Sequence, residues 1–81
     1  MRDVDLLEWV RAVPFVPFRI RLNSGRIYDV RHPEMVKVGR THVLVFTYLD
    51  DPPDVHEKVE MVGLILIEAI EPLERARSEQ S

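Results

Sequence analysis

The hydrophobic residues near the N-terminus recur at the spacing of a helix. Positions three and four residues apart form one apolar stripe, as in an amphipathic helix that lies on a core. The residues of this stripe are Leu6, Leu7, Val10 and Val13. Pro14 disfavours helical backbone at the residue before it, and Pro17 repeats the effect. The pattern predicts a helix over residues 3–13, followed by an extended connector over residues 14–17.

From residue 18 the period changes to two, which is the pattern of a half-buried strand. Asn23-Ser24-Gly25 follows as a three-residue loop, whose last position usually takes a left-handed conformation that glycine adopts without penalty. With this loop Leu22 pairs with Arg26, and the apolar positions of the two strands meet on one face. We expect that face to consist of Phe18, Ile20, Leu22, Tyr28 and Val30.

Short strands separated by turns are predicted for the middle of the chain. His32-Pro33-Glu34 interrupts the second strand, because proline cannot donate to a sheet ladder. Residues 35–38 form the next strand, and residues 41–49 form a long one that is apolar on both faces. A strand of this kind is either central in its sheet or covered by the helix or a second subunit.

The C-terminal part begins with a turn at residues 50–54, which is marked by prolines. Residues 56–62 alternate again, with Val59 and Met61 in one set and Lys58 and Glu60 in the other. The apolar run after Gly63 predicts a short helical turn, which leads into a last buried strand over residues 67–71. Residues 74–81 are charged without an apolar period, and we expect a disordered tail there.

Composition limits the class of protein. The chain has 81 residues, of which 46% are hydrophobic and 31% charged, so one globular domain over residues 1–73 is expected. It has no cysteine, which excludes a disulfide framework, a thiolate zinc site and a cysteine nucleophile. No apolar stretch is long enough to cross a bilayer, and the first ten residues lack a signal-peptide pattern, so a cytoplasmic location without a membrane partner is expected.

The motifs of the chain resemble those of a family of small uncharacterised bacterial proteins. Pro14-Phe15-Val16-Pro17-Phe18 matches their Pro-Phe-x-Pro-Phe opening, Gly25-Arg26 their hairpin, and His32-Pro33-Glu34 their turn. The resemblance covers nearly the whole chain. It implies a fold but no activity, because the family has no established one.

The run from Phe18 to Tyr28 is also similar to the start of the first motif of Sm-like proteins, small barrels that assemble into RNA-binding rings. After this run the sequence departs from that motif: Val30 stands where a second glycine is expected, and the Asp and Asn that hold the base have no counterpart. The likeness therefore implies a topology but not the RNA contacts. The resulting prediction is an α+β, mainly β fold, with an N-terminal helix followed by a bent five-stranded antiparallel sheet or a small SH3/Sm-like barrel.

Two groups of polar residues are candidate sites. The first is a possible anion or nucleic-acid surface on the hairpin, made of Arg19, Arg21, Arg26 and Arg31. The net charge of −3 favours the other interpretation, a solvated face balanced by Asp29 and Glu34.

The second group is a polar turn made of Asp29, His32 and Glu34, where acid–base chemistry would require the three side chains to converge. A turn of this composition is also explained by backbone hydrogen bonding alone. The three histidines lie in separate segments without metal-ligand spacing. The sequence thus predicts no metal, no cofactor and no enzyme activity.

The excess of apolar residues on opposite faces of residues 41–49 and 63–70 is the feature that points to a partner. A chain of this length has too many of these residues to bury internally, so either the helix or a partner covers one of these faces. We therefore expect an interaction or assembly module that forms a homo-oligomer, with a different protein as an alternative partner. An RNA- or DNA-binding ring that uses the hairpin arginines is the main rival hypothesis, and a small metal-dependent or hydrolytic enzyme is a third.

Overall fold

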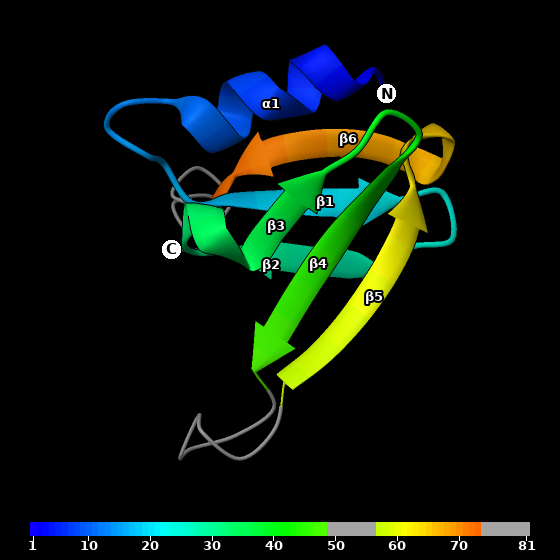
Figure 1. The fold of residues 1–81 in the computed structure, drawn as a ribbon. Coiled ribbons are helices and arrows are strands. Elements are labelled where there is room, and N and C mark those ends of the chain that lie inside the picture. Colours follow the sequence, from blue (N-terminus) through cyan, green and yellow to red (C-terminus); the bar gives the residue numbers. More distant parts are fainter. Residues whose placement is uncertain (49–56, 74–81) are drawn as a thin grey trace, which may run out of the picture.

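The computed structural model describes residues 1–48 and 57–73, which form one helix and six strands (Figure 1). The elements, in chain order, are α1 (Asp3–Arg11), β1 (Phe18–Leu22), β2 (Ile27–Val30), η1 (Pro33–Met35), β3 (Val36–Val38), β4 (His42–Tyr48), β5 (Glu57–Gly63), η2 (Leu64–Leu66) and β6 (Ile67–Pro72). The predicted α+β class is confirmed, but the strands number six rather than five and form two three-stranded antiparallel sheets. The turn predicted at residues 50–54 and the tail predicted at residues 74–81 lie outside the described residues.

The helix α1 ends at Arg11, two residues earlier than the sequence predicted. Ala12 already has extended backbone angles, and Val13 is 95% exposed, so Val13 does not belong to the buried stripe. Leu6 is the residue of the stripe that enters the core, where it is fully buried. None of the helices described is long and apolar enough to cross a membrane.

The first sheet has the strand order β2-β1-β6. Phe18 pairs with Val30 and Ile20 with Tyr28, which is the predicted register of the hairpin. Gly25 has a φ angle of +95°, so the loop uses the left-handed conformation expected there. All five side chains of the predicted apolar face are buried.

The second sheet has the order β3-β4-β5. The long strand β4 is central in it, which is one of the arrangements that its apolar sequence left open, and its Val43 and Val45 side chains are fully buried. The helical turn predicted after Gly63 is confirmed as η2, and β6 follows it back to the first sheet. The inner faces of the two sheets enclose a single hydrophobic core.

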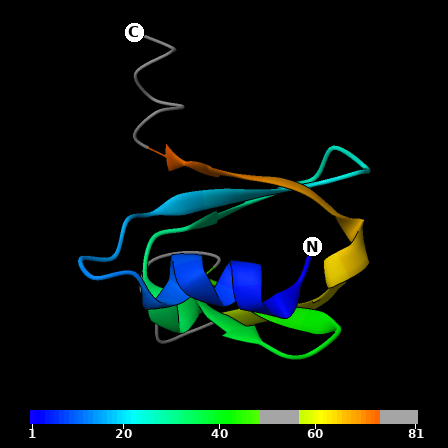
Figure 2. The ribbon, with the colours of Figure 1, turned by 90° about the horizontal axis from the view of Figure 1, so that it is seen from above.

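The two sheets leave two open sides, because their edge strands do not pair with each other. On one side α1 lies over the gap, where it contacts β3 and is seen in front of the β3-β4-β5 sheet in Figure 2. The Trp9 ring of the helix packs on Phe18, with the ring centroids 5.6 Å apart. On the other side, the edge strands β2 and β5 are bridged by a hydrogen bond from Tyr28 to Glu60.

Candidate functional site

Every arginine of the predicted hairpin surface lies beside a carboxylate. Arg19 Nε lies 2.8 Å from Asp29 Oδ1, and Arg31 Nη2 lies 3.9 Å from the other oxygen of that carboxylate. The other two pairs join distant segments of the chain: Arg21 Nη2 with Glu71 Oε1 at 2.8 Å, and Arg26 Nη2 with Glu60 Oε1 at 3.2 Å. Because Arg19 and Arg31 share Asp29, three carboxylates face the four positive charges, and only a small excess of positive charge is left to attract a phosphate backbone.

The sheet register explains this pairing for Arg19. On β1 it stands between Asp29 of β2 and Glu71 of β6, with all three on the outer face of the sheet. The hydrogen bond and the charge of Asp29 raise the pKa of Arg19 above its ordinary value. Glu34, which the sequence offered as a balancing charge, is replaced in that role by Glu71 at the C-terminal end of the sheet.

The residues of the predicted polar turn do not share one site. Asp29 and His32 line a groove of about 470 Å³ together with Arg31, but the Asp29 carboxylate already faces two arginines. Glu34 lines a separate groove with Val36, Lys37 and Phe46. Across residues 1–48 and 57–73, no three His, Asp or Glu side chains are grouped so as to hold a metal ion. The convergence that acid–base chemistry needs is thus missing from this turn.

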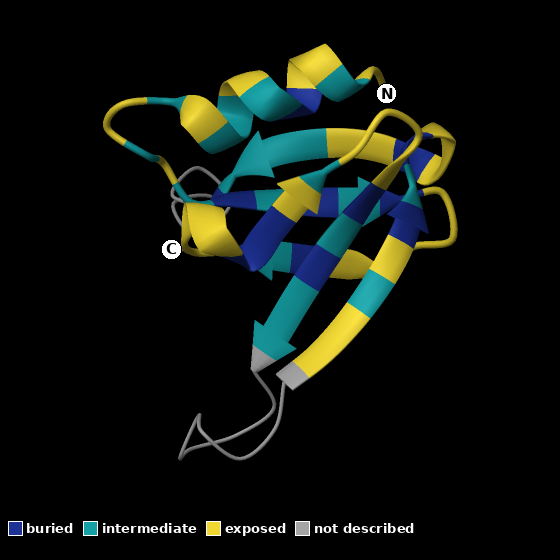
Figure 3. Cartoon of the chain, in the orientation of Figure 1, coloured by how far each residue is buried: buried dark blue, intermediate teal, exposed yellow. Residues whose placement is uncertain are grey.

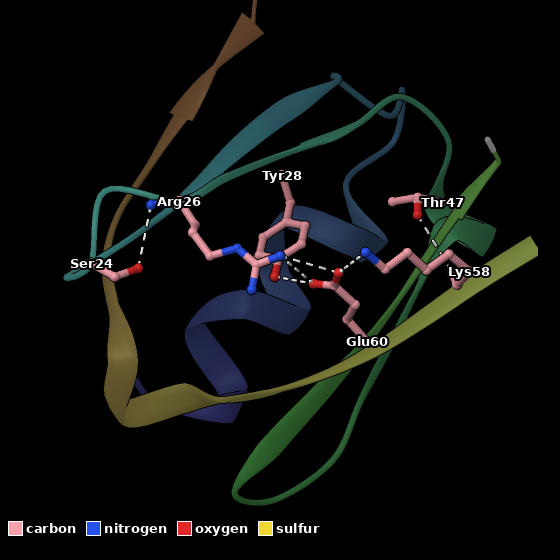
Figure 4. Close-up of polar contacts among 6 residues, drawn as sticks. All are labelled: Ser24, Arg26, Tyr28, Thr47, Lys58 and Glu60. Carbon is pink, nitrogen blue, oxygen red and sulfur yellow. Dashed lines mark hydrogen bonds and ion pairs between the residues drawn. The ribbon is translucent and has the colours of Figure 1, made fainter. Parts of the chain in front are cut away.

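A polar cluster that the sequence did not single out joins the edges of β2 and β5 (Figure 4). Its centre is Glu60, whose side chain is 17% exposed and lies on the inner face of β5. The Tyr28 hydroxyl donates to one carboxylate oxygen, and Lys58 Nζ lies 2.9 Å from the other. Arg26 Nη2 donates to both oxygens, and its guanidinium carbon lies 5.7 Å from the centre of the Tyr28 ring.

The low pKa of Glu60 makes this carboxylate a poor general base at neutral pH. Hydrogen bonds from Lys58 and Tyr28 lower the pKa of Glu60 to about 2, against the opposing effect of burial. Burial and the bond to Glu60 raise the pKa of Tyr28 above its ordinary value. A carboxylate that stays ionised so far below neutrality is a poor proton acceptor, whereas its bonds to Tyr28 and Arg26 join the two sheets.

Exposed apolar side chains mark the outer face of β5. Val59 and Met61 share a face as their alternation predicted, but it is the outer one, and they are 50% and 68% exposed (Figure 3). They pair with Phe46 and Leu44 of β4, which are half-buried, so the outer face of this sheet carries four apolar side chains in two rows.

The edge of β5 is the second distinctive feature of this region. β5 has seven residues and pairs with β4 in an unbroken register, while its other edge has no strand beside it among the residues the structure describes. The candidate site is therefore the surface made of this edge of β5 and its exposed side chains. No family model, curated protein or solved structure matches this chain.

Proposed function

We propose that this chain is a small self-associating module that assembles through the free edge and outer face of β5. The observation that carries the proposal is the combination, on one seven-residue strand, of exposed Val59 and Met61 with an edge that no other described strand pairs with. An unpaired edge presents a row of backbone donors and acceptors to another strand. The apolar side chains beside it add burial to the hydrogen bonds when a partner strand is added.

The other edge strands have features that discourage pairing. β2 has four residues and β3 has three, which gives an added strand few hydrogen bonds. β6 ends at Pro72, and its register with β1 shifts between Arg21 and Leu22. Among the described edge strands, only β5 combines length and regular pairing with an apolar surface.

The rival functions have weaker support. A nucleic-acid surface needs cationic side chains that are free to neutralise phosphates, whereas each hairpin arginine faces a carboxylate. An enzyme centred on Asp29, His32 and Glu34 needs these side chains in one pocket, and Glu34 lines a different groove. Self-association uses features of the surface that these functions leave unexplained.

The test is the solution mass by light scattering, from micromolar to millimolar protein and at low and high salt. We expect a mass of two or more chains that rises with concentration and persists at high salt, because much of the surface to be buried is apolar. A mass of one chain throughout this range would refute the proposal. Retention of nucleic acid at low salt and its loss at high salt would favour the rival surface instead.

A further inference from the structure

The backbone of β5 determines which residues can bond to an added strand. Leu64 N donates to Thr41 O at 2.8 Å, and these two residues continue the β4–β5 register. Hydrogen-bonded pairs alternate in an antiparallel ladder, so Val62, Glu60 and Lys58 bond to β4. The N–H and C=O groups of Val59 and Met61 consequently point to the free edge. The residues with available backbone groups are the same ones whose apolar side chains are exposed.

Charge then selects one alignment of this edge with a second copy. When two identical antiparallel strands pair about a two-fold axis, one residue lies opposite itself and its neighbours lie opposite each other. Centring on Lys58 or on Glu60 places like charges face to face, which is destabilising. Centring on Met61 places Glu60 opposite Val62. Centring on Val59 places Lys58 opposite Glu60 twice, so both charged residues gain an opposite charge.

We infer that two copies of this chain pair through β5, antiparallel and centred on Val59. This inference rests on the proposed function and specifies its interface. The two β3-β4-β5 sheets become one six-stranded sheet, because each contributes three strands. On the outer face Val59 lies opposite its own symmetry mate, which joins the apolar rows of the two sheets. Lys58 lies 2.9 Å from the Glu60 of its own chain (Figure 4). In the pair, it also lies opposite the Glu60 of the second copy on the inner face.

A single introduced cysteine tests the register, because the chain has none of its own. In a hydrogen-bonded antiparallel pair the facing Cα atoms lie about 5.5 Å apart, within the range that a disulfide spans. Val59→Cys should therefore give a rapidly oxidised covalent dimer. Met61→Cys is the matched control on the same strand and face: with this register its two copies lie more than about 13 Å apart. Met61 is the more exposed of the two side chains, so random collision would favour the control.

We expect oxidation of Val59→Cys to be at least about tenfold faster than that of Met61→Cys, measured on non-reducing gels under mild oxidant. Equal rates, faster oxidation of the control, or slow oxidation of both would overturn the register. Light scattering of the unmodified chain separates this failure from failure of the proposed function. If the unmodified chain associates, only the β5 alignment is wrong; if it stays a single chain, both are wrong.

A charge reversal provides a second measurement that introduces no cysteine. Lys58→Glu places like charges opposite each other twice in each dimer, and we expect the dissociation constant to rise about tenfold. Lys37→Glu is the control, since Lys37 is exposed on β3 at the far edge of the same sheet. Thermal unfolding followed by circular dichroism checks that both variants fold. An unchanged dissociation constant for Lys58→Glu, or an equal effect of Lys37→Glu, would contradict the alignment.

Discussion

On the α1 side of the sandwich the gap between the sheets is closed by apolar side chains, whereas on the β2–β5 side it is closed by hydrogen bonds and ion pairs. Leu6 is fully buried beneath the helix, and Trp9 and Phe15 pack around Phe18. On the β2–β5 side, the Glu60 carboxylate accepts a hydrogen bond from the Tyr28 hydroxyl and forms an ion pair with Lys58. The helix covers its side of the sandwich. The polar bridge joins side chains only, and no strand within residues 1–48 and 57–73 pairs with the outer edge of β5.

This difference explains why the two sides differ in exposure, and the β2–β5 side is the one where we propose assembly. Apolar packing is non-directional and gains free energy from the area it removes from water, so a helix that covers this area also seals the gap. A carboxylate is stabilised by its specific partners, and it keeps some contact with solvent at 17% exposure. The polar bridge therefore connects the two sheets without itself covering the edge of β5.

The largest effect is expected on the helix side. Leu6→Ala should lower the free energy of unfolding by about 2–5 kcal/mol, because it leaves a cavity at a fully buried position. Urea unfolding followed by circular dichroism measures this change. Val4→Ala on the same helix is the control; Val4 is 45% exposed, and the change should stay within about 0.5 kcal/mol. The next variant, Tyr28→Phe, weakens the polar bridge. If Leu6→Ala lowers the free energy of unfolding by less than Tyr28→Phe does, the packing of the helix does not stabilise the fold more than the polar bridge.

The next effect is expected in the polar bridge. Tyr28→Phe removes the hydroxyl that donates to Glu60 and should cost about 1–3 kcal/mol, because the half-buried carboxylate loses a partner. A double-mutant cycle with Glu60→Gln isolates the contribution of this pair, and both variants can be measured by urea unfolding. Thr47→Val is the control, since the Thr47 hydroxyl makes only an exposed 3.4 Å contact with Lys58 O. Independent effects of the two bridge substitutions would mean that no coupled bridge exists.

The hairpin shows how much of the fold and of its ion pairs could be predicted from the sequence. The register of β1 and β2 depends on residues within a dozen positions, namely the alternation and the glycine at the loop, and it was predicted correctly. The ion pair of Arg21 with Glu71 was not predicted, because its partners are 50 residues apart and meet only through the pairing of β1 with β6. Local sequence patterns thus predicted the register of the hairpin but not the carboxylate that pairs with Arg21.

The alternation in β5 was ambiguous for a similar reason. It divides the strand into two sets of side chains but does not state which set faces the core. Apolar Val59 and Met61 would ordinarily be assigned inward, yet Glu60 lies on the inner face, where Tyr28 from another sheet supplies its partner. Tyr28 is 32 residues away from Glu60 in the sequence, so only the fold reveals that the two side chains are partners.

The pH dependence of stability distinguishes the two sides further. The pKa of Glu60 in the folded chain is about 2, below the ordinary value of 4.5, so folding favours the ionised carboxylate. Its stabilising effect is fully present above pH 4.5 and is lost as the pH falls from there towards 2. The stability difference between the unmodified chain and Glu60→Gln should therefore shrink over this window, as measured by urea unfolding at several pH values. The difference for Leu6→Ala should stay nearly constant, and a parallel decline would contradict this assignment.

The smallest effect is expected for an ion pair outside the sandwich. Glu71→Gln breaks the bond to Arg21 on the outer face of the first sheet, where the two side chains are 36% and 43% exposed. Solvent screens such a pair, so the loss should be below about 1 kcal/mol and should decrease with added salt. Glu60→Gln is the matched comparison: the same substitution at a carboxylate that is 17% exposed and has three donors. If both variants lose the same stability in urea unfolding, then burial between the sheets does not strengthen the bridge, and the β2–β5 side is held by its apolar contacts instead.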